Sequence, residues 1–212
     1  MLGSRRCADG ADSKVGHGLT TQQQQNDSTA QSKTKAEAKA KSDRRIQSAN
    51  SQDEVVLELS TKRRVSVRRW RSSTLIDIRE FYDDNGSMKP GKKGLSLSTD
   101  QWQTLMGLTS AISEAVDIVK DNNVDETSLS HIHGWIASDA RDRSIVFSLS
   151  AKRRISVRFF GKAVLIDLRE FYQTEGGEHK PGKKGISLSH DQWFALCELR
   201  PEVAAAIEQV GS

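Results

Sequence analysis

The sequence predicts an α+β protein made of two copies of one small module, each a four-stranded antiparallel β-sheet followed by a C-terminal α-helix. The first observation behind this class is a long internal repeat. The second is the hydrophobic pattern of each copy, whose period changes from two residues to about 3.6. The third is that the expected strands are joined by short, turn-rich connections, which suit antiparallel neighbours.

The repeat consists of two closely matching blocks. Residues 60–82 recur as residues 150–172 with 14 of 23 positions identical, and residues 89–102 recur as 180–193 with 12 of 14 identical. The offset between the copies grows from 90 to 91 residues in the intervening turn, where an exposed hairpin tolerates an insertion. The expected organisation is a disordered basic tail over 1–52, a first module over 53–119, a polar linker over 120–143 and a second module over 144–212.

The first half of each copy alternates between apolar and polar residues, as strands with one buried face do. Residues 55–59, Val65 with Val67, and residues 75–82 mark three strands of the first copy. The segment DDNGSMKPGKKG then supplies turn residues, and Leu95 with Leu97 marks the end of a fourth strand. The module therefore begins as an antiparallel sheet.

Each copy ends in an expected helix that begins with a capping box. Ser98 is followed three residues later by Gln101, and the second copy repeats this pattern before its own helix. Apolar residues then follow at helical spacing in both copies. Pro201 lies inside the second helix, where its missing N–H should kink the helix or restart it, so we expect the two helices to differ.

Composition bounds the class of protein. The tail has few large apolar side chains and cannot offset the entropy cost of ordering. The formal net charge is +4. Cys7 and Cys197 cannot build a disulfide framework, no Cys or His cluster has zinc-ligand spacing, and no apolar run reaches the ~18 residues of a membrane span. We therefore expect a soluble intracellular protein with no metal and no other cofactor.

The linker is polar and slightly acidic, and its length should restrict the pairing of the modules very little. Ile132, Trp135 and Ile136 form a short amphipathic segment that can dock on one module. His131 and His133 share a strand-like face there, but two histidines without further ligands are a weak metal site.

The second strand of each copy combines basic and aromatic side chains. Strand alternation places Arg64, Ser66, Arg68 and Trp70 on one face, opposite an apolar face that includes Val65. Cations follow phosphates and rings stack on exposed bases, so this face is typical of a single-strand binding surface. The alternative is a solvated basic strand with an aromatic residue in the core. This alternative is less favoured because the pattern occurs in both copies.

The loop KPGKKG, at residues 89–94 and 180–185, places three lysines among two glycines and a proline. Glycines would let the backbone approach a phosphate closely, with ammonium groups around it. The loop resembles a P-loop only superficially, because it runs into a strand and lacks the Gly-Lys-Ser/Thr ending. Taken alone, the loop is better explained as a basic hairpin turn than as a phosphate site.

Neighbouring carboxylates raise the alternative of a metal-dependent nuclease, because they can hold a divalent ion. Asp77 and Glu80 differ in parity, however, and so face opposite sides of an ideal strand. Each also has an arginine at hand, and the same holds for Asp167 and Glu170. We therefore expect structural ion pairs and a protein that is not an enzyme.

The blocks VSVRRWRSSTLIDIREFY and KPGKKGLSLSTDQW, with their second copies, resemble the transcriptional positive cofactor four family of single-strand DNA-binding coactivators. The resemblance implies a curved sheet backed by the helix, modules that pair through their helices, and two antiparallel channels for single strands. It also implies a nuclear coactivator of transcription by RNA polymerase II that binds unpaired DNA and the transcription machinery.

Together, the basic strand and the resemblance define a set of predicted nucleic-acid-binding residues. Arg79 and Tyr82 face opposite ways in an ideal strand, so a bulge or strong curvature must bring them together. Copy two departs from the family by having Gly161 just after its aromatic residue. The predicted set is Arg63, Arg68, Trp70, Arg71, Arg79, Tyr82 and Lys93, with Arg153, Arg158, Phe160, Lys162, Arg169, Tyr172 and Lys184 in the second copy.

Three questions stay open at this level. The modules can pair within one chain or between chains. RNA is an alternative ligand, because base stacking does not distinguish it from DNA. A different class of function is a scaffold in which one module binds nucleic acid and the module with Pro201 mainly pairs with proteins.

Overall fold

The computed structural model describes residues 54–211, so the expected tail over 1–52 lies outside the described residues. The first module is an antiparallel meander of four strands, as the alternating pattern predicted. Val65 pairs with Ile78 across the second and third strands, which keeps the apolar face continuous. The strands are β1 (Glu54–Ser60), β2 (Arg63–Trp70), β3 (Ser73–Asp84) and β4 (Ser87–Ser98).

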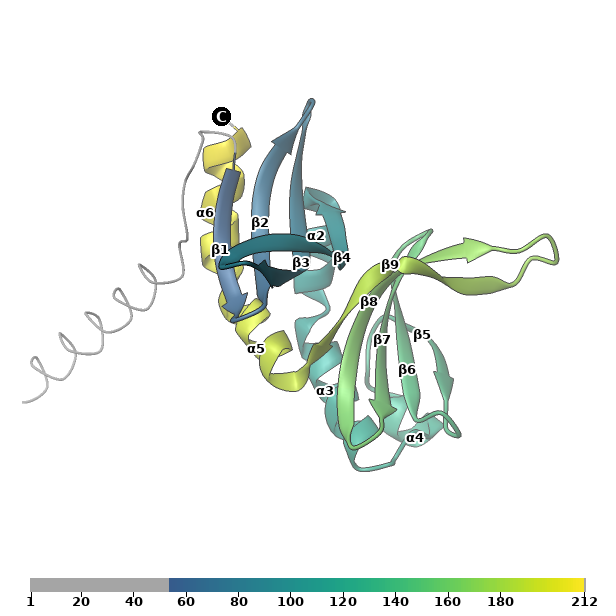
Figure 1. Cartoon of the computed structure of the whole chain (residues 1–212). Helices are drawn as coiled ribbons and strands as arrows, with labels where there is room; N and C mark the ends of the chain where they lie inside the picture. Colours follow the sequence, from purple (N-terminus) through teal and green to yellow (C-terminus); the bar gives the residue numbers. More distant parts are fainter. Residues whose placement is uncertain (1–53, 212) are drawn as a thin grey trace, which may run out of the picture. The chain divides into compact units, whose positions relative to one another are not determined.

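The second module repeats this meander with the same register. Its strands are β6 (Ser144–Ser150), β7 (Arg153–Phe160), β8 (Ala163–Gln173) and β9 (His179–Ser189). Gly94 of β4 pairs with Gly185 of β9 and joins the two meanders in one sheet of order β1-β2-β3-β4-β9-β8-β7-β6-β5 (Figure 1). The predicted fold class, α+β with two antiparallel modules, is confirmed.

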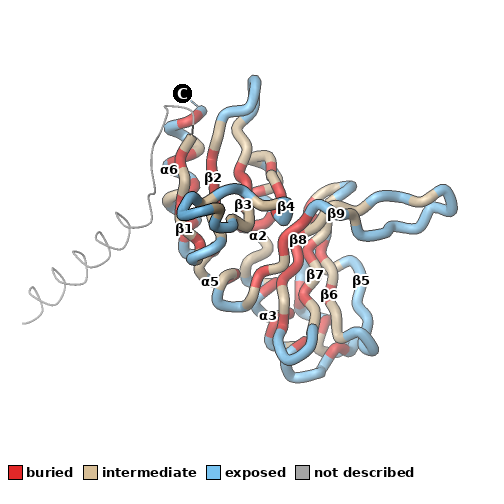
Figure 2. The backbone as a smooth tube through the Cα atoms, in the orientation of Figure 1, coloured by how far each residue is buried: buried red, intermediate tan, exposed pale blue. Residues whose placement is uncertain are grey.

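Each sheet has one buried and one open face, and the burial follows the two-residue alternation of the sequence. Val55, Leu57, Val65 and Val67 are buried, whereas Glu54, Arg64 and Arg68 next to them in the strands stay partly exposed. Figure 2 shows that exposure concentrates at the hairpin ends. The open face therefore carries the polar side chains of the strands.

The helical half of each module differs from the expectation of one helix. Both capping boxes are present, but the first helix breaks at Leu108 and the second at Leu199. Pro201 stands in the first turn of the restarted helix, yet the first module breaks at the equivalent position without a proline. The expectation that Pro201 makes the helices differ is therefore wrong. The helices are α2 (Thr99–Gly107), α3 (Thr109–Lys120), α5 (His190–Glu198) and α6 (Arg200–Gly211).

The break allows each terminal helix to cross to the other module. Helix α3 packs against β6, β7 and β8, and α6 packs against β1, β2 and β3. Ile112 of α3 and Val203 of α6, which are equivalent residues, are fully buried in these contacts. Each apolar face is thus covered by a helix of the partner module, and the modules pair within one chain.

The segment expected to be a loose linker is ordered. It holds α4 (Glu126–Leu129), whose N-cap is Asp125, and β5 (Trp135–Asp139), which pairs with β6 as a fifth strand of the second module. Ile132 is buried and Trp135 is half-buried, so these two dock as predicted, whereas Ile136 is exposed. The expectation that this segment restricts the modules very little is wrong.

Arg143, the last residue of the linker over 120–143, explains why the linker holds a fixed position. The Arg143 guanidinium donates hydrogen bonds to the carbonyls of Val119 (2.5 Å) and Lys120 (2.9 Å), at the C-terminus of α3. A cation at this end of a helix is favoured, because the last carbonyls lack partners and carry partial negative charge. The same guanidinium lies over the Phe159 ring, 3.9 Å from its centroid. The connector therefore ties α3 to β7.

Candidate nucleic-acid interface

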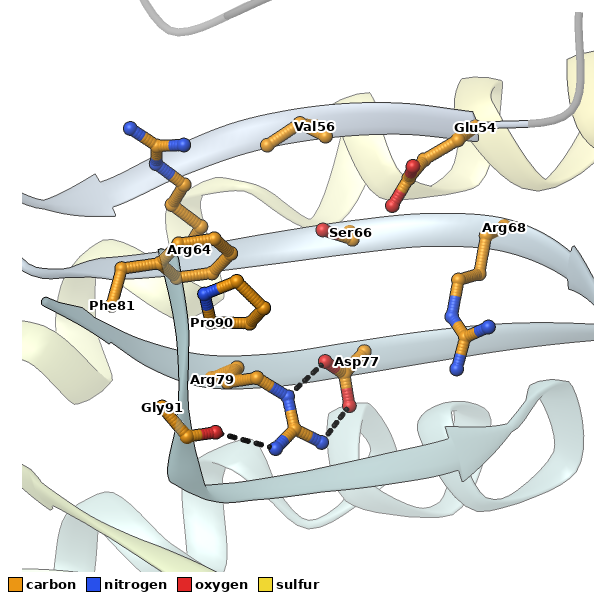
Figure 3. A pocket seen from close by; sticks show the side chains of 10 residues that line it. All are labelled: Glu54, Val56, Arg64, Ser66, Arg68, Asp77, Arg79, Phe81, Pro90 and Gly91. Atoms are coloured by element: carbon orange, nitrogen blue, oxygen red, sulfur yellow. Dashed lines mark hydrogen bonds and ion pairs between the residues drawn. The ribbon is translucent and has the colours of Figure 1, made fainter. Parts of the chain in front are cut away.

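The open face of the first module contains a groove, which we call groove 1. It has a volume of about 580 Å³ and runs across β1, β2 and β3 to the end of β4 that follows the turn. Figure 3 shows its side chains projecting from the three strands into one space. Groove 1 is lined by Glu54, Val56, Arg64, Ser66, Arg68, Asp77, Arg79, Phe81, Pro90 and Gly91.

A buried carboxylate and an arginine form the floor of groove 1. Arg79 Nε and Nη2 donate to the two carboxylate oxygens of Asp77 at 2.7 and 3.0 Å, and Arg79 Nη1 donates to the Gly91 carbonyl at 3.0 Å (Figure 3). The Ser96 hydroxyl donates to Asp77 Oδ1 at 2.6 Å. The arginine thus links β3 to Gly91 of β4, and the predicted structural ion pair at Asp77 is confirmed.

These contacts keep Asp77 ionised although it is buried. Burial by itself would raise the pKa of the Asp77 carboxyl, but hydrogen bonds from Arg79 and Ser96 and the positive charges of Arg79 and Arg68 lower the pKa below its ordinary value. The hydrogen bond to Asp77 in turn raises the pKa of the Arg79 guanidinium. The pair is nearly neutral as a unit, so the net positive charge of the groove comes from other arginines.

A bulge in β4 gives the groove its end wall. Arg79 pairs with Gly94 and Phe81 with Pro90, so residues 91–93 of β4 oppose Glu80 alone. The bulge that the sequence required is present, but it lies in β4 and leaves the alternation of β3 intact. Arg79 and Phe81 therefore line the groove, whereas Tyr82 is exposed and lies outside its lining. Gly91, which lines the groove, lies beside the Tyr82 ring, with 3.9 Å between a Cβ placed on Gly91 and Tyr82 Cδ1, and the expectation that Tyr82 acts together with Arg79 stays a prediction.

The glycines of the KPGKKG loops act within the sheet. A Cβ on Gly94 would lie 2.9 Å from the Ile78 carbonyl oxygen, and one on Gly185 would lie 2.8 Å from that of Leu168. Both glycines are buried at the junction of β4 and β9. The sequence suggested that these glycines let the backbone approach a phosphate, and the close approaches that Gly94 and Gly185 make are to a neighbouring strand and to the other module.

Two rings accompany the arginines of the first module. Trp70 stands at the end of β2, is 54% exposed, and has the Arg68 guanidinium 5.3 Å from its ring centroid. Inside the groove, the Arg64 guanidinium lies 4.7 Å from the Phe81 centroid. Both arrangements are cation–π contacts, in which the cation and the ring hold each other in place. An exposed ring held in this way offers a flat apolar face beside a positive charge.

The second module builds the same site, which we call groove 2. Its volume is about 420 Å³. Arg158 lies 5.1 Å from the Phe160 centroid and Arg154 lies 4.9 Å from that of Phe171, and Arg169 binds Asp167 through two hydrogen bonds. Groove 2 is lined by Ser156, Arg158, Asp167, Arg169, Phe171, Pro181 and Gly182, all equivalent to residues of groove 1.

The remaining predicted residues lie around the grooves. Arg71 and Lys162 are exposed at the tips of the β2–β3 and β7–β8 hairpins. Lys93 and Lys184 are exposed on the bulges, and their Nζ atoms lie 3.8 and 3.9 Å from carboxylate oxygens of Glu80 and Glu170. Tyr172, like its counterpart in the first module, is exposed beyond the groove. Pairs this exposed bind weakly and leave the lysines accessible.

Arg63 and Arg153 lie on the other side of their strands from the grooves. Arg153 donates to Glu170 Oε1 at 2.9 Å and to the side chain of Gln101 in α2, so it bridges the two modules. Burial lowers the pKa of the Arg63 guanidinium, although the charge of Glu80 acts in the opposite direction. Their guanidinium groups serve the protein's own packing, and we leave both residues out of the interface.

Sequence reasoning missed the rings inside the grooves, Phe81 and Phe171, and so did not pair them with Arg64, which it had placed on the open face, or with Arg154. The signal was present, since Phe81 is two residues from Arg79 and Arg64 is two residues from Ser66, which is the spacing of one strand face. Glu54 was missed as well, because its position at the groove depends on the β1–β2 register.

Two further findings concern alternatives. Within residues 54–211, no group of three or more His, Cys, Asp or Glu side chains is placed to hold a metal ion. Of the carboxylates that suggested a nuclease, Asp77, Asp167 and Glu170 are bound by arginines, and Glu80 lies beside Lys93. No helix in this same range is long and apolar enough to cross a bilayer.

The fold and the grooves thus define a class of protein, a tandem α+β module with a cationic and aromatic groove on each sheet. The family model described as Transcriptional Coactivator p15 (PC4) matches residues 57–108 and again residues 147–199. The chain belongs to this family and carries its domain twice.

Curated relatives agree with this assignment. The chain is 52% identical over 69 residues to the RNA polymerase II transcriptional coactivator KIWI of Arabidopsis thaliana, covering 32% of this chain and 64% of that protein. It is 44% identical over 80 residues to the RNA polymerase II transcriptional coactivator SUB1 of Saccharomyces cerevisiae, covering 37% and 26%. An RNA polymerase II transcriptional coactivator of Drosophila melanogaster is 42% identical over 55 residues, covering 26% and 50%. The chain thus spans between 26% and 64% of these relatives.

Two solved structures are similar over one module's length of sequence. A MoSub1–DNA complex is 36% identical, with 36% of this chain and 96% of that chain covered and a TM-score of 0.32. A MoSub1–ssDNA complex in phosphate buffer is 38% identical, with 38% and 93% covered and a TM-score of 0.33.

Proposed function

We propose that this chain is a single-stranded DNA-binding transcriptional coactivator of RNA polymerase II that acts in the nucleus, also binds melted or unpaired DNA, and is not an enzyme. The observation that carries the proposal is the pair of equivalent grooves, each with arginines along its length and an exposed ring held by an arginine at its end. Family membership and relatives that are named as coactivators support the role in transcription.

In the proposed mode of binding, bases stack on Trp70 and Phe160 while phosphates lie along the cations beside them. Stacking needs a base whose face is exposed, so an intact duplex is a poor ligand. A ring accepts any base, and arginine contacts to phosphate carry no sequence information, so binding is largely independent of sequence. The proposed phosphate contacts are Arg68, Arg71, Arg79 and Lys93 in the first module, and Arg158, Lys162, Arg169 and Lys184 in the second.

Phe81 and Phe171 join the proposed interface as groove walls, whereas Tyr82 and Tyr172 are proposed as outlying contacts for a longer strand. Arg79 and Arg169 each use three N–H groups within the protein, so two N–H groups of each guanidinium are left for the proposed phosphate contact. Both modules keep a complete groove, so we favour two binding modules over a scaffold in which only one binds.

Alanine substitution of the exposed rings tests the proposal in the full chain. Trp70→Ala and Phe160→Ala should each weaken binding of a fluorescently labelled oligothymidine by about 1–3 kcal/mol, the value of one stacked base. Phe194→Ala is the matched control, because Phe194 is an exposed ring (60%) on α5, outside both grooves. Fluorescence anisotropy gives the affinities and circular dichroism checks the fold.

Two outcomes would contradict the proposal. In one, the wild type binds the oligothymidine no more tightly than a duplex of the same length. In the other, Phe194→Ala loses as much affinity as Trp70→Ala or Phe160→Ala. Oligouridine in the same titration compares RNA with DNA, since both offer stacking and phosphates. Binding should also weaken as salt rises, because phosphate contacts release counterions.

A further inference from the structure

The two grooves share one framework. At seven equivalent positions they are lined by the same residue types, and the arginine-to-ring distances at their ends differ by only 0.2 Å (5.3 against 5.1 Å). The buried ion pair is also repeated, with closely similar distances. Any difference in how tightly the two grooves bind a nucleic-acid strand must therefore come from the residues that differ between them.

The first unshared residue is the exposed ring. Trp70 and Phe160 are equivalent, similarly exposed (54% and 61%), and held by equivalent arginines. An indole offers a larger face to a base than a phenyl ring, and it is also the stronger partner for a cation. Stacking at the end of groove 1 is therefore more extensive than at the end of groove 2.

The second unshared residue follows the ring at the hairpin tip. Arg71 has φ 56° and its counterpart Gly161 has φ 64°. Glycine adopts this left-handed conformation freely, whereas a residue with a Cβ is strained there. The first module keeps a strained arginine where the second shows that a relaxed residue fits. Strain of this kind is maintained at sites where the side chain is used, and a guanidinium can bind a phosphate through two hydrogen bonds.

Glu54 acts against groove 1. It lines this groove and pairs in register with Arg68, whereas the equivalent residue of the second module is Ser144. Its carboxylate repels a phosphate and offsets part of the attraction from Arg71, and Lys162, one residue after Gly161, places a cation at the tip beside groove 2. These charge effects are exposed to solvent and weaken as salt rises, but stacking on a ring does not. The advantage of groove 1 therefore persists when salt is added.

We infer that the two grooves are unequal, and that the Trp70–Arg71 tip makes groove 1 the primary site for a single strand and groove 2 the secondary one. This inference rests on the proposed function. It gives the protein a fixed order of occupancy, in which one strand is held at groove 1 before a second strand, or a second part of the same strand, enters groove 2. Two identical modules would have no such order.

Reciprocal exchange of the rings in the full chain tests the inference. An oligothymidine of eight nucleotides, which is on the order of one site, is titrated calorimetrically at low and at high salt. The wild type should bind in two steps whose affinities differ by about five- to tenfold, a fraction of the effect of a whole stacked base. Trp70→Phe should lower the tighter affinity, Phe160→Trp should raise the weaker one, and each should bring the two steps together.

Arg71→Gly completes the set. It should weaken the tighter step and leave the weaker one unchanged, and it should raise the thermal stability because the strain at this position is relieved. Two equal steps in the wild type, or loss of the tighter step in Phe160→Ala instead of Trp70→Ala, would overturn the inference while the proposed function stands. Absence of any strand binding in the wild type would instead overturn the proposed function.

Discussion

At the scale of single residues, Asp77 is the group whose ionisation holds groove 1 in shape. Asp77→Asn should lower the free energy of unfolding at neutral pH by about 1–3 kcal/mol, because the hydrogen-bonded arginine loses a charged partner in a largely buried position. Asp84→Asn, which removes the exposed partner of Lys89, is the control and should change stability little. Urea denaturation measures both.

The same carboxylate predicts a pH dependence. Its pKa in the folded protein lies below the ordinary value of 3.8, so its ionised form stabilises the fold above that value, and the contribution is lost as pH falls below it. Urea denaturation between neutral and acidic pH should therefore show a smaller loss of stability in Asp77→Asn than in the wild type. An identical acid profile for the two proteins would show that the Asp77 interaction does not stabilise the fold.

The sequence predicted the residues at the groove ends better than those inside. Alternation placed Arg68 and Trp70 on the open face correctly, because β2 is a regular strand without a bulge. It was of less use near Arg79, where Tyr82 was chosen and Phe81 lines the groove. The bulge that decides this lies in β4, and a bulge in a partner strand leaves no mark on the alternation of the strand itself.

At the scale of elements, the two glycines that pair at the β4–β9 junction pack closely against backbone atoms of the neighbouring strand in their own modules. Gly185→Ala should lower the free energy of unfolding by about 1–3 kcal/mol, the usual cost of overpacking, because the Leu168 carbonyl oxygen would lie 2.8 Å from the new Cβ. Gly107→Ala is the matched control in α2, where a Cβ meets nothing within 4 Å. It should be neutral or stabilising, since alanine favours helix. Thermal denaturation that ranks the two variants in the opposite order would contradict this account of the packing of Gly185 against β8.

Strands and helix starts were readable from local patterns, but helix ends and the fifth strand were not. The capping boxes at Ser98 and Ser189 fix two helix starts by local hydrogen bonds. The breaks at Leu108 and Leu199 carry no local signal that the two copies share, because only one has a proline nearby. Strand β5 forms at the free edge of β6, so its existence depends on a tertiary contact.

At the scale of the whole molecule, the exchange of helices between the modules was not predictable from the sequence alone. Equivalent apolar residues line α3 and α6, as Ile112 and Val203 do, and the sheets they cover are also nearly identical. Either helix therefore suits either sheet by pattern. What distinguishes the arrangements is the connector, since Arg143 binds the end of α3 and stacks on Phe159 of the second module.

The exchange predicts that damage to one helix is felt in the other module. Ile112→Ala, on α3, should accelerate amide hydrogen exchange in β7 more than in β2, and Val203→Ala, on α6, should do the reverse. Each substitution removes part of a fully buried side chain and should lower the free energy of unfolding by about 2 kcal/mol or more. Exchange measured by mass spectrometry on peptides from β2 and β7 compares the two variants under conditions where unfolding is local. If each substitution loosened the sheet of its own module instead, the helices would not be exchanged in solution, and the paired grooves would belong to a different arrangement of the chain.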